Sequence, residues 1–227
     1  MMTNHHLFKN YYDGKKDRCF ILGTAPSLND IDLEPLKNEV TIGVNQICLA
    51  MIPSFTVVGD NECLLKNEEI IFNEKTKKET NFVFVKNGAG TELPERFIVG
   101  AHRAKILTSI EEIPYFIDDK FQFCSNTGGS VVQDVAIPLA CWLGFKEINL
   151  LGCDGGFRHF FQPDGTDGNV LGLERKHGIK RPRQRWDLVI KELNKRDIFL
   201  YNCSPTNTFE DLTYKEYPFS KKIKQEK

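Results

Sequence analysis

The 227-residue sequence lacks an excess of charge of either sign, and it has no long apolar run. Lys and Arg number 30 against 31 Asp and Glu, which gives a formal net charge of −1. This balance argues against a chain whose main partner is the nucleic-acid backbone, so no nucleic-acid partner is expected. No stretch approaches the roughly 18 apolar residues of a membrane-spanning helix, so we expect no transmembrane segment. Residues 1–18 contain no apolar stretch of signal-peptide length.

Cysteine pairs of the C-x-x-C type are also missing, although the chain has seven cysteines. Most of them lie inside apolar runs such as CFILG, LACWLG and LLGCD. We interpret them as small buried hydrophobic side chains in a reducing compartment, so the chain is predicted to be cytoplasmic and without a metal site. The basic tail, residues 220–227, adds the alternative of weak peripheral contact with the anionic inner face of the membrane.

Internal repeats and low-complexity linkers are absent, and short apolar runs alternate with helix-like stretches. That alternation predicts a single α/β domain with a mainly parallel sheet over residues 18–219, after an N-terminal arm at residues 1–17. The runs are continuously apolar, which is typical of strands covered by helices on both faces. The expected strands are residues 19–23, 40–44, 55–58, 82–85, 148–152 and 198–201, with a further candidate at 105–108.

Two longer helices are expected. Residues 129–143 are apolar almost all round, which predicts a buried helix kinked near its middle by Pro138. Residues 183–196 are amphipathic. The apolar face of this second helix comprises Trp186, Val189, Ile190 and Leu193. The polar segment 157–182 lacks periodicity and is predicted to be a mobile lid loop, with solvated disorder as the alternative.

Polar and glycine-bearing motifs follow several of the expected strands. Because the carboxyl ends of parallel strands meet at one edge of an open α/β sheet, and ligands bind there, these motifs predict one nucleotide site. The candidate nucleotide-binding residues are Gly23, Thr24, Ala25, Pro26 and Ser27 after the first strand, Asn45 after the second, Asp60 and Asn61 after the third, and Gly152 and Asp154 after the strand at 148–152. The alternatives are a plain strand-to-helix turn at 23–27, a loop cap at Asn45 and a helix N-cap at Asp60.

The start of the buried helix is a further candidate for binding an anion. Two glycines and neighbouring hydroxyls at a helix N-terminus suit phosphate, with ordinary capping by Thr127 or Ser130 as the alternative. These residues are Thr127, Gly128, Gly129 and Ser130. The 157–182 loop adds a basic cluster, of which Arg158, Lys180 and Arg181 are the candidate phosphate or anion ligands. It also holds His159 and His177, either of which would act as a general base near neutral pH.

Taken in order, these segments resemble one superfamily over roughly residues 18–217. The segments that carry the resemblance are ILGTAPSLNDID, TIGVNQ, PSFTVVGD, NTGGSVVQDVAIPLACWLGFKEINLLGCDGGF and IFLYNCSPTNTFEDLTYKEY. They are similar to the MptE-like (6-hydroxymethylpterin diphosphokinase-like) Rossmann domain superfamily and to the related CMP-sialic-acid-dependent bacterial sialyltransferases. The resemblance implies a Rossmann-like fold and a nucleotide-using transferase.

The two branches share some positions with this chain and differ at others. In the sialyltransferases the first motif is usually G-N-G-P-S-L, where this chain has Thr24 and Ala25. The positions that match are Asn45, Asp60 or Asn61, the helix start Thr127–Ser130, Gly152, Asp154 and, for the histidine assigned there as general base, His177. The tyrosines that assist the leaving group in that family are not matched, and the corresponding loop holds Phe157, Phe160 and Phe161. Residues 158–165, RHFFQPDG, resemble instead a stretch of the MptE-like branch.

Three functions follow from these motifs. The leading one is a CMP-sugar glycosyltransferase, sialyltransferase-like, that works without a cofactor on a glycan acceptor in surface polysaccharide or glycoconjugate synthesis. The second is an MptE-like pyrophosphokinase that transfers diphosphate from ATP to a pterin-like alcohol, with Mg²⁺ held by acids such as Asp60 and Asp154. The third is a nucleotide-binding module without catalysis. A homo-oligomer is left open in each case.

Overall fold

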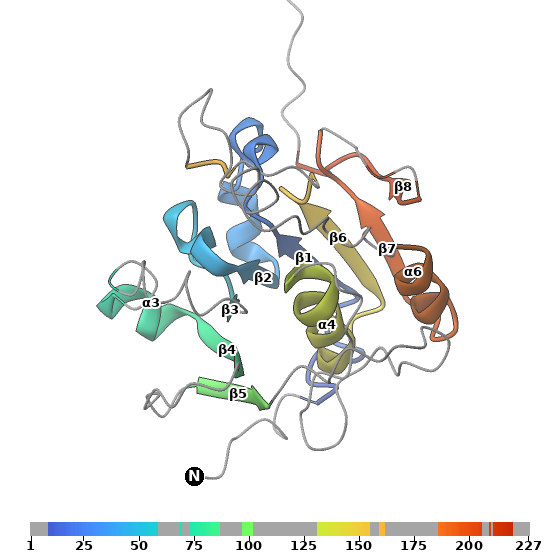
Figure 1. The fold of residues 1–227 in the computed structure, drawn as a ribbon, viewed down its shortest axis with the longest axis horizontal. Coiled ribbons are helices and arrows are strands. Elements are labelled where there is room, and N and C mark those ends of the chain that lie inside the picture. Colours follow the sequence, from blue (N-terminus) through green and yellow to red (C-terminus); the bar gives the residue numbers. More distant parts are fainter. Residues whose placement is uncertain are drawn as a thin grey trace, which may run out of the picture.

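The computed structural model describes residues 9–58, 69, 73–86, 97–101, 131–154, 159–161, 186–205, 209 and 211–219. Within these ranges the strands form one eight-stranded sheet in the order β5-β4-β3-β2-β1-β6-β7-β8 (Figure 1). Every neighbouring pair of strands runs parallel. The prediction of an α/β domain with a mainly parallel sheet is therefore confirmed.

The six continuously apolar runs all form strands, with ends shifted by at most one residue from the expected bounds. They are β1 (Arg18–Leu22), β2 (Thr41–Val44), β3 (Phe55–Val58), β4 (Asn81–Lys86), β6 (Glu147–Leu151) and β7 (Phe199–Asn202). The two outer strands, β5 (Phe97–Ala101) and β8 (Thr213–Tyr214), were not among the expected strands, although FIVGA in β5 is also an apolar run. The strand expected at 105–108 lies outside the described residues.

Helices cover both faces of the sheet, as the apolar strands predicted. The first face carries the π-helix η6 (Val132–Ala136), α4 (Ile137–Leu143) and α6 (Trp186–Asn194). The second face carries three short 3-10 helices, η2 (Pro26–Asp30), η3 (Glu34–Asn38) and η4 (Asn45–Leu49). A further helix, α3 (Glu74–Glu79), precedes β4. The fold is therefore a three-layered, Rossmann-like α/β arrangement.

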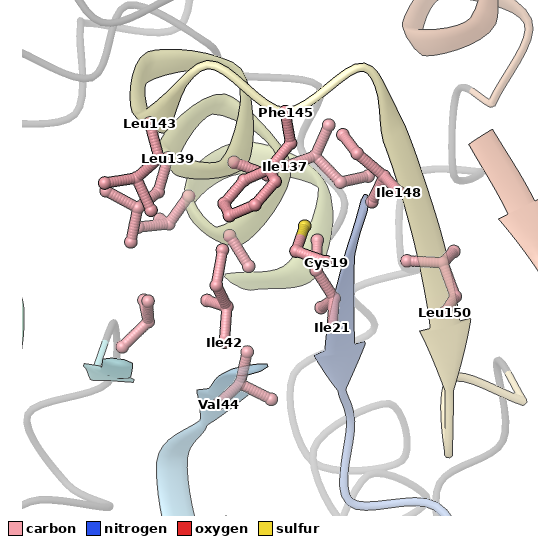
Figure 2. Packing of buried hydrophobic residues seen from close by; sticks show 14 of the residues in the cluster. Cys19, Ile21, Ile42, Val44, Ile137, Leu139, Leu143, Phe145, Ile148 and Leu150 are labelled. Carbon is pink, nitrogen blue, oxygen red and sulfur yellow. The ribbon is translucent and has the colours of Figure 1, made fainter. Parts of the chain in front are cut away.

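Alternate residues of β1 belong to different cores. Cys19 and Ile21 pack in the cluster beneath α4, which Figure 2 shows together with residues of β2 and β6. Phe20 and Leu22 pack in the cluster beneath the 3-10 helices. All four side chains are fully buried. This period of two, with apolar residues on both sides, explains why the strand shows no polar alternation in the sequence.

The buried helix around Pro138 is not simply kinked, as was expected, but contains a π-helical turn. The Ile137 N–H donates to the Val132 carbonyl, five residues back, in η6. Pro138 has no N–H to donate to the carbonyl of Asp134, so a regular α-helical ladder cannot pass through this point. Gly144, at φ +94°, ends α4 in a left-handed conformation that glycine adopts without strain.

The amphipathic helix is confirmed in α6. Trp186, Val189 and Leu193 are buried against the sheet, and Ile190 packs partly against the same core. α6 ends at Asn194, two residues before the expected end, and residues 183–185 lie outside the described part of the chain. Among the described residues, no helix has the length and apolar character that crossing a membrane requires.

Residues 9–17, expected to form an arm outside the domain, dock on the end of α4. The Asn10 N–H donates to the Trp142 carbonyl at 2.8 Å, and the Tyr12 N–H to the Leu143 carbonyl at 2.9 Å. The Tyr12 ring stacks on Phe145 with centroids 4.8 Å apart. The segment thus supplies donors to carbonyls that a helix C-terminus otherwise leaves unsatisfied.

The order of the strands reverses beside β1. From β1 the chain builds β2, β3, β4 and β5 on one side, and it then places β6 and β7 on the other side. The carboxyl ends of β1 and β6 are therefore the topological switch point, where open α/β sheets bind ligands. The predicted lid loop at 157–182 lies outside the described residues, apart from 159–161.

Candidate functional site

The carboxyl ends of β2, β1 and β6 bring together three of the polar motifs singled out in the sequence. Asn45 follows β2, residues 23–27 follow β1, and residues 152–154 follow β6. These three strands are adjacent and parallel, so their ends share one edge of the sheet. The other candidate site residues lie outside the described part of the chain, and their roles stay predictions: Asp60, Asn61, Thr127, Gly128, Gly129, Ser130, Arg158, His177, Lys180 and Arg181.

Asp154 binds the turn that follows β1. Ser27 Oγ donates to Asp154 Oδ1 at 2.5 Å, and the Ser27 N–H donates to Oδ2 at 3.2 Å. Both residues are buried, so hydrogen bonds to a carboxylate compensate here for lost water. The contact joins residues 127 positions apart and holds the end of β6 against the start of η2. The predicted contact of Asp154 with a ribose, a base or Mg²⁺ stays a prediction.

The two glycines of these motifs are explained by the approach of one strand end to the other. An added Cβ on Gly23 would stand 2.1 Å from the Gly152 carbonyl oxygen. Gly152 itself has φ +62°, which an L side chain rarely adopts. In addition, the Ala25 N–H donates to the Gly152 carbonyl at 2.9 Å. Sequence reasoning had attributed the glycines to the approach of a ligand, whereas the described contacts are with the neighbouring backbone.

His159 lies at the same edge because the turn after β1 holds it there. Thr24 Oγ1 and His159 Nδ1 are 2.7 Å apart. The Phe160 N–H donates to the Thr24 carbonyl at 2.8 Å, and Asn29 Nδ2 donates to the Phe160 carbonyl at 3.1 Å. The His159 ring also stacks on Phe161, with centroids 5.2 Å apart and planes 2° apart. Of the two candidate histidines, the structure describes this one.

Asn45 combines a left-handed backbone with a buried, unpartnered acceptor. Its φ is +50°, a conformation that costs energy for a residue with a side chain. Its Oδ1 is buried and has no hydrogen-bond partner in the described structure. A buried carbonyl oxygen without a donor is costly, and such atoms in native proteins call for an explanation such as a missing ligand.

Of the five described cysteines, Cys19, Cys153 and Cys203 are buried, and Cys48 and Cys141 are partly buried. Burial raises the pKa of Cys153, next to Asp154, to about 12, and the charge of Asp154 adds to that rise. Burial also raises the pKa of Cys141 and Cys203 to about 12. A thiol with such a pKa is a poor nucleophile at neutral pH. Among the described residues, no three or more His, Cys, Asp or Glu side chains gather in a way that could hold a metal ion.

A cavity of about 320 Å³ lies at the opposite, amino-terminal edge of the sheet, near the starts of β6 and β7. Its lining includes Lys9, Lys146 and Arg196, together with Asp13 and Trp142. The sequence did not point to this hollow, because it depends on the docking of residues 9–17. It is separated from the switch point by the length of the strands, so it does not belong to the site described above.

No protein family matches the chain, and no curated relative does. Three solved structures are similar to it. A variant of sialyltransferase Cst-II in complex with CMP is 17% identical over 91% of this chain and 88% of that chain, with a TM-score of 0.49. Sialyltransferase CstII from Campylobacter jejuni with the substrate analogue CMP-3FNeuAc is 14% identical over 90% and 87%, with a TM-score of 0.45. The same enzyme with cytidine-5'-monophosphate is 17% identical over 87% and 84%, with a TM-score of 0.40. All three TM-scores are below 0.5, so the function must be argued from the residues of the chain.

Proposed function

We propose that this chain is a nucleotide-dependent glycosyltransferase that uses a CMP-activated sugar, in the synthesis of surface polysaccharide or glycoconjugates. The observation that carries the proposal is Asn45 at the end of β2, the strand next to the switch point. Its strained backbone and buried, unpartnered Oδ1 are explained if a ligand donates a hydrogen bond there. The amino group of cytosine and a ribose hydroxyl are both donors of the required kind. The motif resemblance to CMP-sugar transferases selects cytidine among the nucleosides.

The proposed reaction is a direct displacement at the anomeric carbon of the sugar. A general base, His159 or His177, removes the proton of the acceptor hydroxyl as its oxygen attacks. The nucleoside monophosphate leaves with the electron pair of the broken bond. His159 is already held at the edge of the sheet by Thr24, Phe160 and Phe161. Fixing a reacting group in this way lowers the entropic part of the barrier.

The remaining candidate residues complete the proposed site. The turn at residues 23–27 and the helix start at 127–130 would hold the phosphate. Asn45 would bind the ribose or the base, and Asp154 would keep the turn in place through Ser27. Cations from the 157–182 segment would close over the leaving nucleotide; these are Arg158, Lys180 and Arg181. Exclusion of water at that stage would protect the donor from hydrolysis.

The test is a thermal-shift panel of CMP, CDP, UDP, GDP, ADP and ATP, each with and without Mg²⁺. A ligand at a hundred times its dissociation constant adds about 2.7 kcal/mol to the free energy of unfolding, which such a panel detects. We expect stabilisation by the cytidine nucleotides without a need for Mg²⁺. Release of CMP from a CMP-sugar in the presence of a glycan acceptor would then establish transfer.

The same panel distinguishes the proposed glycosyltransferase from the two alternative functions. Stabilisation by ATP that strictly requires Mg²⁺ would overturn the proposal in favour of a pyrophosphokinase. Stabilisation by CMP without turnover of any CMP-sugar would leave a binding module without catalysis. No stabilisation by any nucleotide would contradict all three functions.

A further inference from the structure

Thr24 and His159 form a contact whose role in the proposed reaction has not been described above. We propose that Thr24 is a positioning residue that fixes His159 as the general base, an inference that rests on the proposed transferase function. Thr24 belongs to the turn after β1, and His159 follows β6, so the pair bridges the two strands of the switch point. Thr24 Oγ1 lies 2.7 Å from His159 Nδ1. With this assignment His159, and not His177, is the proposed base of the two histidines that the sequence left open.

The segment around His159 is held independently of that hydroxyl. The Phe160 N–H binds the Thr24 main-chain carbonyl, and Asn29 Nδ2 binds the Phe160 carbonyl. Phe161 fixes the plane of the imidazole by stacking. What the Thr24 hydroxyl adds is therefore specific: it is the partner of Nδ1, and the direction of that bond goes with the position of the proton in the neutral ring. Removal of this hydroxyl leaves the main-chain contacts intact.

Only one tautomer of this pair can act as a base. If the Thr24 hydroxyl donated to Nδ1, the proton of the neutral ring would sit on Nε2, and neither nitrogen could accept another one without breaking the contact. If Nδ1–H donates to Thr24 Oγ1, Nε2 carries the lone pair. The bond to Oγ1 then survives protonation of Nε2, because both nitrogens of an imidazolium are donors. For His159 to act as the base, the pair must be in the Nδ1–H form, in which Thr24 Oγ1 also stabilises the cation that follows.

The proton and the electrons balance in the resulting step. The oxygen of the acceptor hydroxyl forms a bond to the anomeric carbon of the CMP-sugar, and its proton passes to His159 Nε2. The bond between that carbon and the phosphate oxygen breaks, and its electron pair leaves with CMP. The imidazolium then loses the proton to water, which restores the Nδ1–H form for the next turnover.

The first test needs no substrate, so it fails or succeeds separately from the proposed function. Nitrogen-15 NMR of histidine-labelled full-length protein distinguishes a protonated ring nitrogen from one with a lone pair, and the His159→Asn variant identifies the signals of His159. We expect a neutral His159 with the proton on Nδ1 in the wild type and in Thr24→Ser. In Thr24→Val we expect a mixture of both tautomers. A proton on Nε2 in the wild type, or no difference between Thr24→Val and Thr24→Ser, would overturn the inference.

The second test uses turnover of a CMP-sugar with a glycan acceptor. We expect Thr24→Val to lower kcat by about 10- to 100-fold with little change in KM, and Thr24→Ser to restore most of it. His159→Asn should lower kcat by about 100-fold or more, because the amide keeps a donor near Thr24 but cannot take up the proton. Equal melting temperatures of the variants show that folding is intact. Loss of turnover in His177→Asn together with full turnover in His159→Asn would overturn the inference.

Discussion

Gly23 is the residue at which the site is least tolerant of change. An alanine there would place Cβ 2.1 Å from the Gly152 carbonyl oxygen, and backbone atoms cannot move aside cheaply. We expect Gly23→Ala to lower the free energy of unfolding by about 3 kcal/mol, at the upper end of overpacking costs. Gly14→Ala is the control, because only its φ of +68° is unfavourable and nothing lies within 4 Å. Its loss should be about 1 kcal/mol. Equal losses in urea denaturation would contradict the role given to Gly23.

Replacement of Asn45 by glycine should have opposite effects on the stability of the fold and on the affinity for CMP. Asn45→Gly relieves the left-handed backbone and removes a buried, unpartnered oxygen, so the free energy of unfolding should rise by up to about 1 kcal/mol. Affinity for CMP should fall by about tenfold, the worth of one hydrogen bond to a ligand. Asn10→Gly is a matched control, since Asn10 has φ +55° but lies on the other edge of the sheet.

The two measurements for this pair are urea denaturation and calorimetric titration with CMP. We expect Asn10→Gly to gain stability in the same range with unchanged CMP affinity. A CMP affinity of Asn45→Gly equal to that of the wild type would refute the assignment of Asn45 to the nucleotide. A large loss of stability in Asn45→Gly would instead show that its side chain holds the fold.

At the scale of residues, the sequence predicts where a candidate site residue lies better than it predicts which residue it forms a hydrogen bond with. Asn45, Thr24 and Asp154 were expected at one edge because parallel strands end there together, and they lie there. The bonds that they form were not predicted. Thr24 meets His159 across 135 residues, and Ser27 meets Asp154 across 127. Such contacts depend on how two loops fold over the strand ends, which no local pattern in the sequence records.

At the scale of elements, most of the long apolar segments were predicted, and the apolar strand β5, FIVGA, was missed. The six apolar runs and the amphipathic helix α6 were located from their patterns. β8 has only two residues, both exposed, so it has no apolar run to detect. The 3-10 helices η2, η3 and η4 have five residues each, which is too short for a helical period to appear.

The docked segment at residues 9–17 yields a prediction for one of two adjacent tyrosines. Tyr12 stacks on Phe145 and packs against the core beneath α4, whereas Tyr11 is 46% exposed. We expect Tyr12→Ala to lower the free energy of unfolding by about 2 kcal/mol, less than a fully buried aromatic would. Tyr11→Ala should cost less than about 0.5 kcal/mol. If thermal and urea denaturation show the same loss for both variants, the segment does not contribute through Tyr12.

At the scale of the whole molecule, the reversal of strand order places the site between two halves of the sheet. β2 to β5 extend from one side of β1, and β6 to β8 extend from the other. The Thr24–His159 and Ser27–Asp154 contacts cross this line, so each half contributes to the same site. Composition and periodicity predict parallel strands but not their order; that depends on which helices cover which face. The family resemblance implied a Rossmann-like fold, and no strand order was predicted.

Glu147, the first residue of β6, pairs with Lys215 in the segment after β8. This ion pair predicts that the stability of the fold depends on pH. Burial alone would raise the pKa of Glu147, but hydrogen bonds from Lys215 and Asn149 and the charges of Lys215 and Arg18 outweigh it and lower the pKa. Lys215 Nζ lies 2.6 Å from Glu147 Oε1. A lowered folded-state pKa contributes stability that is present above the unfolded-state value and is lost as pH falls through the folded one.

Glu147→Gln should therefore be less stable than the wild type at pH 7, by about 0.5 to 1 kcal/mol for a partly exposed pair. The difference should shrink as pH falls below the unfolded-state value of about 4.5, and it should vanish once the wild-type carboxyl is protonated in the folded state as well. Glu34→Gln is the control, since the Glu34–Lys37 ion pair lies on the surface and should contribute little at any pH. Urea denaturation from pH 3 to pH 8 measures both variants. A difference for Glu147→Gln that does not change with pH would mean that the charge of the side chain does not hold β6 to the segment after β8.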